Sequence, residues 1–219
     1  VLAADDGAAE LLAGRGYERV RSFFRMVVDV DGELPAPQWP PGLELRPFDA
    51  AAHAEAAYTT VMEAFADEWG FDQIPFEEWH ERTAARPQFA ADLVPAVWDG
   101  DALAAVAILY RKRHGDWGWV GQLAVRSAYR RRGVGQALLA ESFRRFRDDG
   151  ETVVALGVDV QNPTGATRLY ERAGMRVLWR ADGRGRPGRG PAHRRPPTAP
   201  GRHHRPARGG GSWHRRCRG

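Results

Sequence analysis

One stretch of about 25 residues limits what this chain can fold into: a strand, a glycine-containing turn and a helix follow one another without a break. The strand ends in three apolar residues, Leu123, Ala124 and Val125. The helix that follows has apolar residues at i, i+4 and i+7, which give it one buried face. These residues are Leu139, Phe143 and Phe146, with Leu138 beside them. The stretch therefore predicts a helix packed against a sheet.

The turn between strand and helix has the composition of an anion-binding site. It contains Arg130, Arg131 and Arg132, then Gly133 and Gly135. The first N–H groups of a helix have no partner within the helix, and the helix dipole favours an anion beside them. Glycine lets a ligand approach the backbone because it has no Cβ. An ordinary strand-to-helix turn is the alternative on this stretch alone.

Two common phosphate-binding motifs are excluded by the residues after the glycines. A P-loop needs Lys and then Ser or Thr, whereas Gln136 and Ala137 follow here. A dinucleotide-binding motif needs a third glycine, and that position is Leu138.

A second stretch, Val153 to Val160, is a nearly continuous apolar run, which is typical of a strand buried on both faces. Asn162 and Pro163 follow it, and this pair also suits a helix N-cap with Pro at N1. A short amphipathic helix, ended by Gly174, and a strand from Met175 to Trp179 are expected next. The apolar positions of that helix are Ala166, Leu169, Tyr170 and Ala173.

Together the two stretches resemble the GNAT superfamily of N-acyltransferases. The segment Arg130-x-x-Gly133-x-Gly135 is similar to the loop that binds the pyrophosphate of acyl-CoA in that superfamily. The later similarity covers Asn162, Ala166, Leu169, Tyr170, Gly174 and Met175. Ser127 and Met175 depart from the Pro and Phe that are common there, and neither departure removes a backbone contact.

The resemblance implies an α/β (α+β) fold, with a mixed, mostly antiparallel central sheet flanked by helices. It implies acetyl-CoA as co-substrate, bound where the strands ending near Val125 and Val160 splay apart. A backbone amide at Leu123 or Ala124 would stabilise the oxyanion. Tyr170 would protonate the departing thiolate, or be plain core. The implied cofactor-binding residues are Leu123, Ala124, Val125, Arg130, Arg131, Arg132, Gly133, Val134, Gly135, Gln136, Asn162, Ala166 and Tyr170.

The general base is less well defined. Many relatives carry a carboxylate on the fourth strand, but the segment Trp117 to Gln122 has none, and only Asp116 borders it. We take Glu68 as the catalytic candidate. The other candidates are Glu63, Asp67, Glu77, Glu78 and His80. The alternative is that each of them is an ordinary helix residue exposed to solvent. As a group, their negative charges would attract a cationic amine toward the site.

The chain divides into four parts. Residues 1–31 resemble the last helix and strands of an upstream GNAT-like domain, as in tandem proteins of the mycothiol synthase group; a plain N-terminal helix and hairpin is the alternative. Residues 32–42 form a Pro-rich linker. Residues 43–182 form the acyltransferase domain, whose last strand is missing, so that Met175 to Trp179 has an open edge. A speculative repair is that Ser22 to Val30 fills this position.

Within residues 43–182 the pattern predicts the order β-α-α-β-β-β-α-β-α-β. Asp49 caps the first helix, which runs to about Ala66 and buries one stripe. That stripe is Ala54, Ala57, Tyr58, Val61, Met62 and Phe65. The other elements expected before the two stretches are a strand at Leu43–Arg46, a helix at Phe76–Ala85 and strands at Leu93–Trp98, Ala102–Tyr110 and Trp117–Val125.

Residues 183–219 hold 11 Arg and no Asp or Glu, so the net charge of +4 hides a charge of −7 on residues 1–182. A segment of this composition is expected to be disordered. A frame-shifted read near Asp182 is one hypothesis for its origin. Nucleic acid is an unlikely partner, bound only non-specifically through this tail.

The single cysteine, Cys217, excludes a disulfide framework and a Cys metal site, and no metal is expected. Without a signal peptide or an apolar run near 18 residues, we expect a cytoplasmic chain and no membrane partner.

Three functions from different classes follow. The first is an N-acetyltransferase that moves an acetyl group from acetyl-CoA to the primary amine of a small molecule by direct attack. The second is a catalytically impaired GNAT-fold module that binds acyl-CoA. The third is nucleic-acid binding by the basic tail. The sequence does not identify the acyl acceptor.

Overall fold

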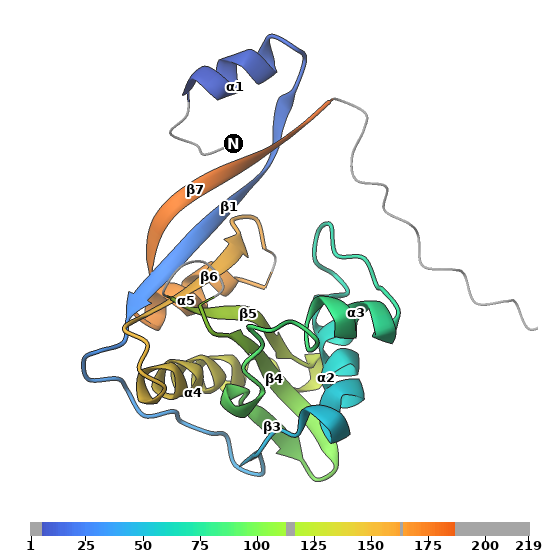
Figure 1. The fold of residues 1–219 in the computed structure, drawn as a ribbon, viewed down its shortest axis with the longest axis vertical. Helices are drawn as coiled ribbons and strands as arrows, with labels where there is room; N and C mark the ends of the chain where they lie inside the picture. Colours follow the sequence, from blue (N-terminus) through green and yellow to red (C-terminus); the bar gives the residue numbers. More distant parts are fainter. Residues whose placement is uncertain (1–5, 113–116, 163, 187–219) are drawn as a thin grey trace, which may run out of the picture.

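The computed structural model describes residues 6–112, 117–162 and 164–186 as a single mixed sheet with helices on both faces (Figure 1). The expected α/β class with a mostly antiparallel sheet is confirmed. The helices are α1 (Asp6–Ala13), α2 (Ala50–Phe65), α3 (Phe76–Arg82), α4 (Val134–Asp148) and α5 (Ala166–Arg172). The strands are β1 (Glu18–Asp29), β2 (Glu44–Arg46), β3 (Ala96–Asp99), β4 (Ala102–Tyr110), β5 (Gly118–Val125), β6 (Val153–Asp159) and β7 (Arg176–Gly185).

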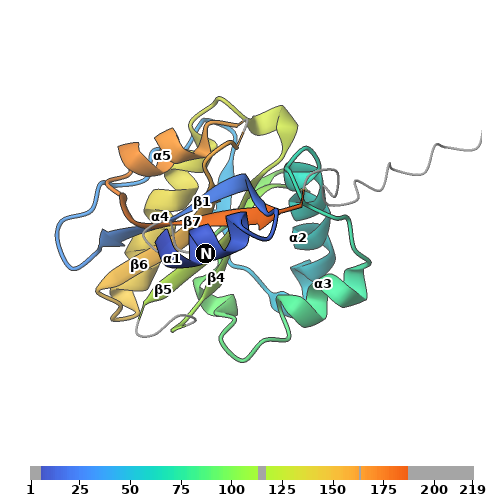
Figure 2. The same cartoon turned by 90° about the horizontal axis from the view of Figure 1, so that it is seen from above.

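The seven strands lie in the order β2-β3-β4-β5-β6-β1-β7. Every neighbouring pair is antiparallel except β5 and β6, which run parallel. Helices α4 and α5 cover one face of the sheet, and α2 and α3 cover the other (Figure 2). Two hydrophobic clusters result, one under α4 and α5 and one under α2 and α3.

The local signals in the sequence explain the central elements. The Asp49 side chain caps α2 by accepting hydrogen bonds from the N–H groups of Ala51 and Ala52, at 2.8 and 3.1 Å. On α4 the expected apolar stripe is buried, and Phe146 is fully buried. Residues 102–110 are an almost unbroken apolar run, and all but the first residue of β4 is buried, because helices cover both faces of the sheet here.

The N-terminal segment contributes a central strand. Residues 18–29 form one continuous strand, β1, where a strand pair was expected, and β1 lies between β6 and β7. Met26 and Val27 are buried to 0% and 2% exposure, as befits an interior strand. The speculative placement of Ser22 to Val30 beside the last strand is confirmed: Ser22 pairs with Asp182, and Arg25 pairs with Trp179. The expected open edge is therefore occupied.

Three expected boundaries were wrong. Strand β7 runs to Gly185, three residues beyond the expected domain end, because β1 supplies a pairing partner along its whole length. Leu93 belongs to a short 3-10 helix, Ala91–Leu93, so β3 begins only at Ala96. Helix α3 ends at Arg82, before the expected Ala85. The upstream-domain origin of residues 1–31 and the frame-shift hypothesis stay predictions, and the tail beyond residue 186 lies outside the described residues.

Within the described part of the chain, no helix has the length and apolar character needed to cross a bilayer. The same residues contain no group of three or more His, Cys, Asp or Glu side chains arranged to hold a metal ion. The cytoplasmic location stays a prediction.

Candidate active site

The site lies where the two parallel strands separate. Strands β5 and β6 pair at only three positions, the last being Val120 with Leu156. Beyond them β5 continues to pair with β4, and β6 continues to pair with β1. The two strands therefore diverge and open a wedge in the middle of the sheet, at the place expected from the sequence.

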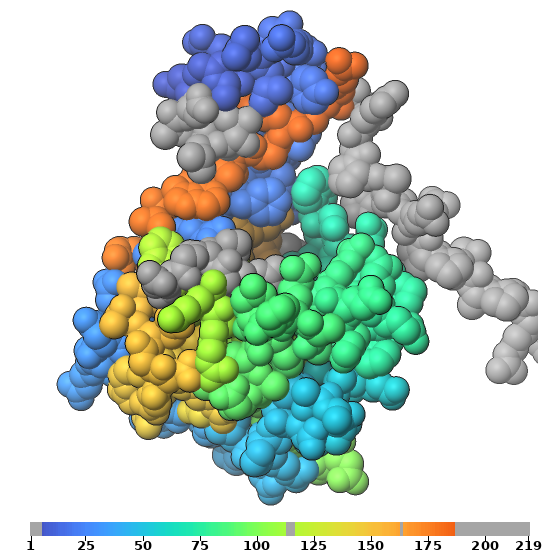
Figure 3. Space-filling model, in the orientation of Figure 1, coloured from blue at the N-terminus to red at the C-terminus, as the bar shows by residue number. Residues whose placement is uncertain are grey.

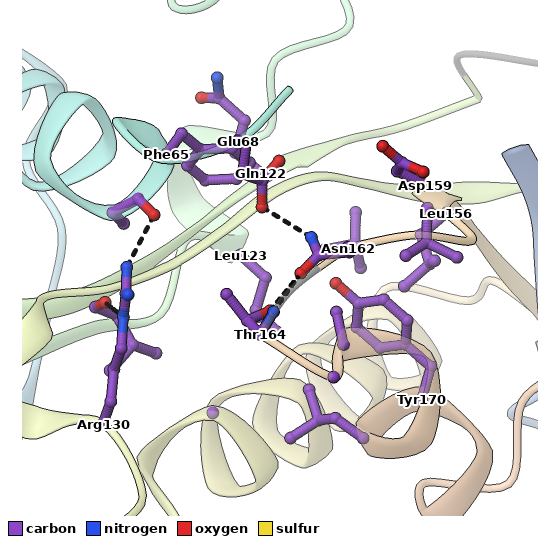
Figure 4. Close-up of a pocket in the computed structure, with 18 of the residues that line it drawn as sticks. Phe65, Glu68, Gln122, Leu123, Arg130, Leu156, Asp159, Asn162, Thr164 and Tyr170 are labelled. Atoms are coloured by element: carbon purple, nitrogen blue, oxygen red, sulfur yellow. Dashed lines mark hydrogen bonds between the residues drawn. The ribbon is translucent and has the colours of Figure 1, made fainter. Parts of the chain in front are cut away.

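A cavity of about 840 Å³ fills this wedge. Its walls come from the end of α2 and the following loop, the separated ends of β5 and β6, and the starts of α4 and α5 (Figure 4). Ten of the thirteen cofactor-binding residues expected from the sequence lie on its wall, the exceptions being Ala124, Arg132 and Val134. In the space-filling view, α1 and the ends of β1 and β7 that lie beside it protrude above the body that holds this site (Figure 3).

Strand β5 directs alternate backbone amides into the wedge. The N–H of Arg126 donates to the Ala104 carbonyl on β4, at 3.1 Å. Hydrogen-bonded and non-bonded pairs alternate in an antiparallel ladder, so the N–H of Ala124, like that of Arg126, points toward β4. The N–H of Leu123 points the opposite way, into the space left where β6 has separated from β5. The Val125 carbonyl points the same way, since it accepts from Arg130 Nε at 3.1 Å. The expected alternative at Ala124 was therefore wrong, and Leu123 is the available amide.

A bulge on the same strand lies beside this amide. Ile108 pairs with Gln122, but the next residue, Leu109, pairs with Val120, so Gly121 is the extra residue. A Cβ at Gly121 would lie 2.4 Å from Tyr110 Cε2. Glycine is therefore the residue that lets the strand bend here without displacing a buried tyrosine.

The basic turn is used differently from expectation. The Arg130 side chain donates to the carbonyls of Val125 and Ala64, at 3.1 and 2.7 Å, so it ties the turn to β5 and α2. Arg132 lies over the Tyr129 ring at 5.8 Å. These two bonds use two of the five N–H donors of Arg130, and its expected contact with CoA phosphates stays a prediction. Arg131, with a φ of 60°, lines the cavity.

The start of α4 is open to the cavity. Its N-cap is Gly133, with a φ of 83°, and no side chain caps the helix. Gly133, Gly135 and Gln136 line the cavity, whereas Val134 points into the core and is 1% exposed. Val134 can therefore contribute only its backbone to a ligand.

Asn162 holds a carboxylate and does not cap a helix. Its Nδ2 donates to Glu68 Oε1 at 2.8 Å, and its Oδ1 accepts from the N–H and hydroxyl of Thr164 (Figure 4). Helix α5 begins later, at Ala166, with Gly165 in the left-handed region as its N-cap. The expected N-cap role was wrong, because the N–H of Gly165 donates to the Asn162 carbonyl and α5 begins only after this turn. Pro163 lies outside the described residues.

Glu68 is a partly buried carboxylate at the cavity wall. Burial raises its pKa, and the negative charge of Asp159 adds to the effect; the hydrogen bond from Asn162 and the charge of Arg130 oppose it. The net shift is upward. A carboxylate with a raised pKa binds a proton more readily at neutral pH than an exposed one.

The other acidic candidates are placed elsewhere. Glu63 forms an ion pair with Arg126 and accepts from the N–H and hydroxyl of Ser127. Burial opposes these hydrogen bonds, but they outweigh it and lower the pKa of Glu63. Asp67 lines the cavity, whereas the cavity wall does not include Glu77, Glu78 or His80 of α3. Glu63 therefore anchors the turn that follows β5.

Tyr170 lies across the wedge from Glu68, and its ring packs in the cluster under α4 and α5 while it lines the cavity (Figure 4). Burial raises the pKa of its hydroxyl, and the nearby charge of Glu68 raises it further. The hydroxyl is therefore protonated at neutral pH. Strand β5, the α4 turn, Glu68 and Tyr170 surround one space, in which a thioester and an amine can meet.

Comparison with known proteins identifies the class. A family model described as Acetyltransferase (GNAT) family matches residues 54–175, more than half of the chain. The chain belongs to the GNAT acetyltransferase family, whose members use acetyl-CoA.

Individual relatives agree with this assignment. The chain is 32% identical over 187 residues to a mycothiol acetyltransferase of Thermobispora bispora, and 31% identical over 193 residues to one of Geodermatophilus obscurus. Each match covers 80% of this chain and 60% of the relative, so the chain spans about 60% of their length. A crystal structure of a GCN5-related N-acetyltransferase from Sphaerobacter thermophilus superposes with a TM-score of 0.73 at 32% identity, covering 83% of this chain and 56% of that one.

Proposed function

We propose that the chain is an N-acetyltransferase that transfers the acetyl group of acetyl-CoA to the primary amine of a small molecule by direct attack. The observation that carries this proposal is the wedge between β5 and β6, with Tyr170 and Glu68 on its opposite walls. The curated relatives are named mycothiol acetyltransferases, which supports a small-molecule acceptor. The tandem arrangement stays a prediction.

The donor is bound mainly by backbone in this proposal. The uncapped first turn of α4 offers N–H groups to the pyrophosphate, and the helix dipole stabilises an anion there by about 0.3–1 kcal/mol, up to about 2 kcal/mol when partly buried. Arg131, Gly133, Gly135 and Gln136 line this end of the cavity. Ala166 at the start of α5 lines the wall that the pantetheine arm would follow.

The chemical step uses three groups of this chain. As the amine nitrogen attacks, the Leu123 amide stabilises the developing oxyanion. The new C–N bond forms while the C–S bond breaks. The sulfur then takes the proton of the Tyr170 hydroxyl. Because burial raises the pKa of that hydroxyl, it carries a proton at neutral pH.

Glu68 is the base in this proposal. It accepts a proton from the attacking amine, directly or through one water. Its raised pKa favours this role, and Asn162 holds its side chain in place. Asn162 therefore positions the base, since both ends of its amide are already hydrogen-bonded within the protein.

The test is the melting temperature of the chain with and without acetyl-CoA, together with release of the CoA thiol from acetyl-CoA across a panel of amines. Ligand at 100 times its dissociation constant stabilises a fold by about 2.7 kcal/mol. The Tyr170→Phe variant should keep the melting shift and lose turnover by about 10²- to 10⁴-fold. A shift without turnover on any amine would favour the alternative, an acyl-CoA-binding module. No shift in a chain that melts cooperatively would contradict both.

A further inference from the structure

Strand β1 brings an arginine to the face of the sheet opposite α4 and α5. Arg25 pairs with Gly157 on β6 and with Trp179 on β7. Directly opposed residues in antiparallel strands direct their side chains to the same face. Met26, the next residue, faces the cluster under α4 and α5, so Arg25 faces the side of α2 and α3.

Two tryptophans flank this arginine. Its guanidinium lies 4.2 Å from the centre of the Trp119 ring and 5.0 Å from that of Trp179. The Trp119 indole packs over Gly157, where a Cβ would lie 3.8 Å from the ring, an ordinary contact distance. The three side chains come from β1, β5 and β7, so the arrangement crosses β6, which lies between β5 and β1. We name Arg25, Trp119 and Trp179 the arginine clamp.

The clamp lies next to the cavity wall: its own side chains are not among the described residues that line the cavity, but its neighbour Gly157 is. Gly157 and Asp159 line the cavity wall, and Arg25 is the neighbour of Gly157 on β1, about 5 Å away at the backbone. Glu68, the proposed base, lies near enough to Asp159 for their charges to interact. Gly157 and Asp159 are two residues apart, about 7 Å along a strand. The clamp and the proposed base therefore lie beside two residues of β6, Gly157 and Asp159, that share one face of the sheet.

Among the residues that the structure describes, no carboxylate neutralises the charge of Arg25. On the same strand Arg21 forms an ion pair with Asp159 at 2.6 Å, and on β7 Arg180 pairs with Asp182 at 3.0 Å. Within the described ranges, no Asp or Glu oxygen lies within 4.0 Å of the Arg25 guanidinium. Burial lowers the pKa of Arg25, which reflects loss of water from a cation. An anion at the edge of this guanidinium would replace that water.

We propose that the arginine clamp binds a carboxylate of the acyl acceptor, so that the acceptor is an amino acid or a short ω-amino acid whose amine faces Glu68. A guanidinium stacked on aromatic rings keeps its N–H groups at its edge free for a carboxylate, which it binds as a bidentate pair. Cation and carboxylate at the two ends of the site are complementary to a zwitterion. This inference rests on the proposed function, and Arg25 is a specificity-determining residue in it.

The first measurement is the affinity of the whole chain for candidate acceptors without acetyl-CoA, monitored by the fluorescence of its tryptophans. The probes are the L-amino acids, β-alanine and 4-aminobutyrate, each compared with its primary amide, which keeps the amine and removes the carboxylate charge. The best acids should bind at least about ten-fold more tightly than their amides, as expected for loss of a charge-assisted hydrogen bond. Equal binding of acid and amide, or no binding of any acid, would overturn the proposal.

The second measurement uses variants and CoA release. Arg25→Gln should raise KM for the acids and bring the acid-to-amide ratio close to one. Arg25→Lys should keep part of the preference, because it keeps the charge but not the planar fork. Arg19→Gln, an exposed arginine on the same strand, is the matched control and should keep the full preference. If Arg25→Gln kept the preference for the acids over their amides, Arg25 would have only a structural role and the proposal would be overturned.

The two proposals fail in different ways. An unchanged melting shift with acetyl-CoA in Arg25→Gln shows that the donor site and the fold are intact. If the wild-type chain shows no such shift, the proposed acetyltransferase function is contradicted, while the fluorescence comparison still decides whether the clamp binds carboxylates. Should Arg25→Gln fail to fold, Arg25→Lys and the acid-to-amide comparison in the wild-type chain decide the same question.

Discussion

Gly118 and Gly157, two glycines on the strands that form the wedge, should respond oppositely to the same substitution. Gly118 lies on β5 against α4, and a Cβ there would lie 2.7 Å from Phe146 Cδ1 and 2.9 Å from Cε1 and Cγ. At Gly157 on β6, the nearest atoms to such a Cβ belong to Trp119, at 3.8 and 3.9 Å. Ordinary carbon contacts are about 3.5–4.0 Å, so only the first substitution forces atoms to move.

The size of the effect follows from where Phe146 is held. Its side chain is fully buried and must retreat by about 1 Å into a packed core, which costs about 1–3 kcal/mol. Gly157→Ala should be neutral or stabilise by up to about 1 kcal/mol, because it restricts the unfolded chain. For a chain of this size 1 kcal/mol corresponds to about 2–4 °C, so Gly118→Ala should lower the melting temperature by about 2–12 °C.

The assay is chemical denaturation of both variants, followed by a double-mutant cycle. Phe146→Leu removes the far edge of the ring, so the double variant Gly118→Ala/Phe146→Leu should be less destabilised than the sum of the single variants. A coupling of at least about 0.5 kcal/mol is expected for residues in contact. Additive effects, or equal destabilisation by Gly118→Ala and Gly157→Ala, would refute the steric explanation.

Four further outcomes are expected. Glu68→Gln should remove the acidic limb of the pH–rate profile, which lies above the ordinary carboxyl pKa of 4.5; an unchanged limb would exclude Glu68 as base. The pKa of the same carboxyl is higher in the folded than in the unfolded chain, so Glu68 stabilises the fold below about pH 4.5. This contribution is lost as pH rises through the folded pKa, so the unfolding free energy of Glu68→Gln should lack this part of its dependence on pH. Asn162→Ala should move the acidic limb to higher pH, because the hydrogen bond from Asn162 lowers the Glu68 pKa; movement to lower pH would contradict this. Gly133→Ala should cost about 1–2 kcal/mol in denaturation, since φ is 83° there, and a variant as stable as the wild type would argue against a strained N-cap.

Local patterns predicted most of the elements around the wedge. The apolar run of β6, the amphipathic α4 and the Asp49 cap are decided by neighbours in sequence, so their periodicity is visible without a structure. The position of the cavity followed from the resemblance to a family, and ten of the expected ligand residues do line it.

What the sequence did not reveal depends on contacts between distant residues. The strand pattern of β1 was visible, but its position between β6 and β7 was no more than a speculation, because pairing with residues 153–185 leaves no local signal. Asn162 looked like a helix cap, and only the structure brings Glu68 to it, 94 residues away in the chain. The clamp was missed for the same reason, since its members come from three separate strands.

The place of β1 also bears on how the chain acquires its structure during synthesis. Phe23 pairs with Asp159, and Glu18 pairs with Gly185, so this strand is synthesised well before the strands with which it pairs. At about 5–20 residues per second, a ribosome needs roughly 7–33 seconds to reach them. During that interval, residues 18–29 have no partner strand and expose Met26, Val27 and Val28, which the finished protein buries. Such high contact order makes folding slow, and this strand is the segment that a chaperone would need to protect.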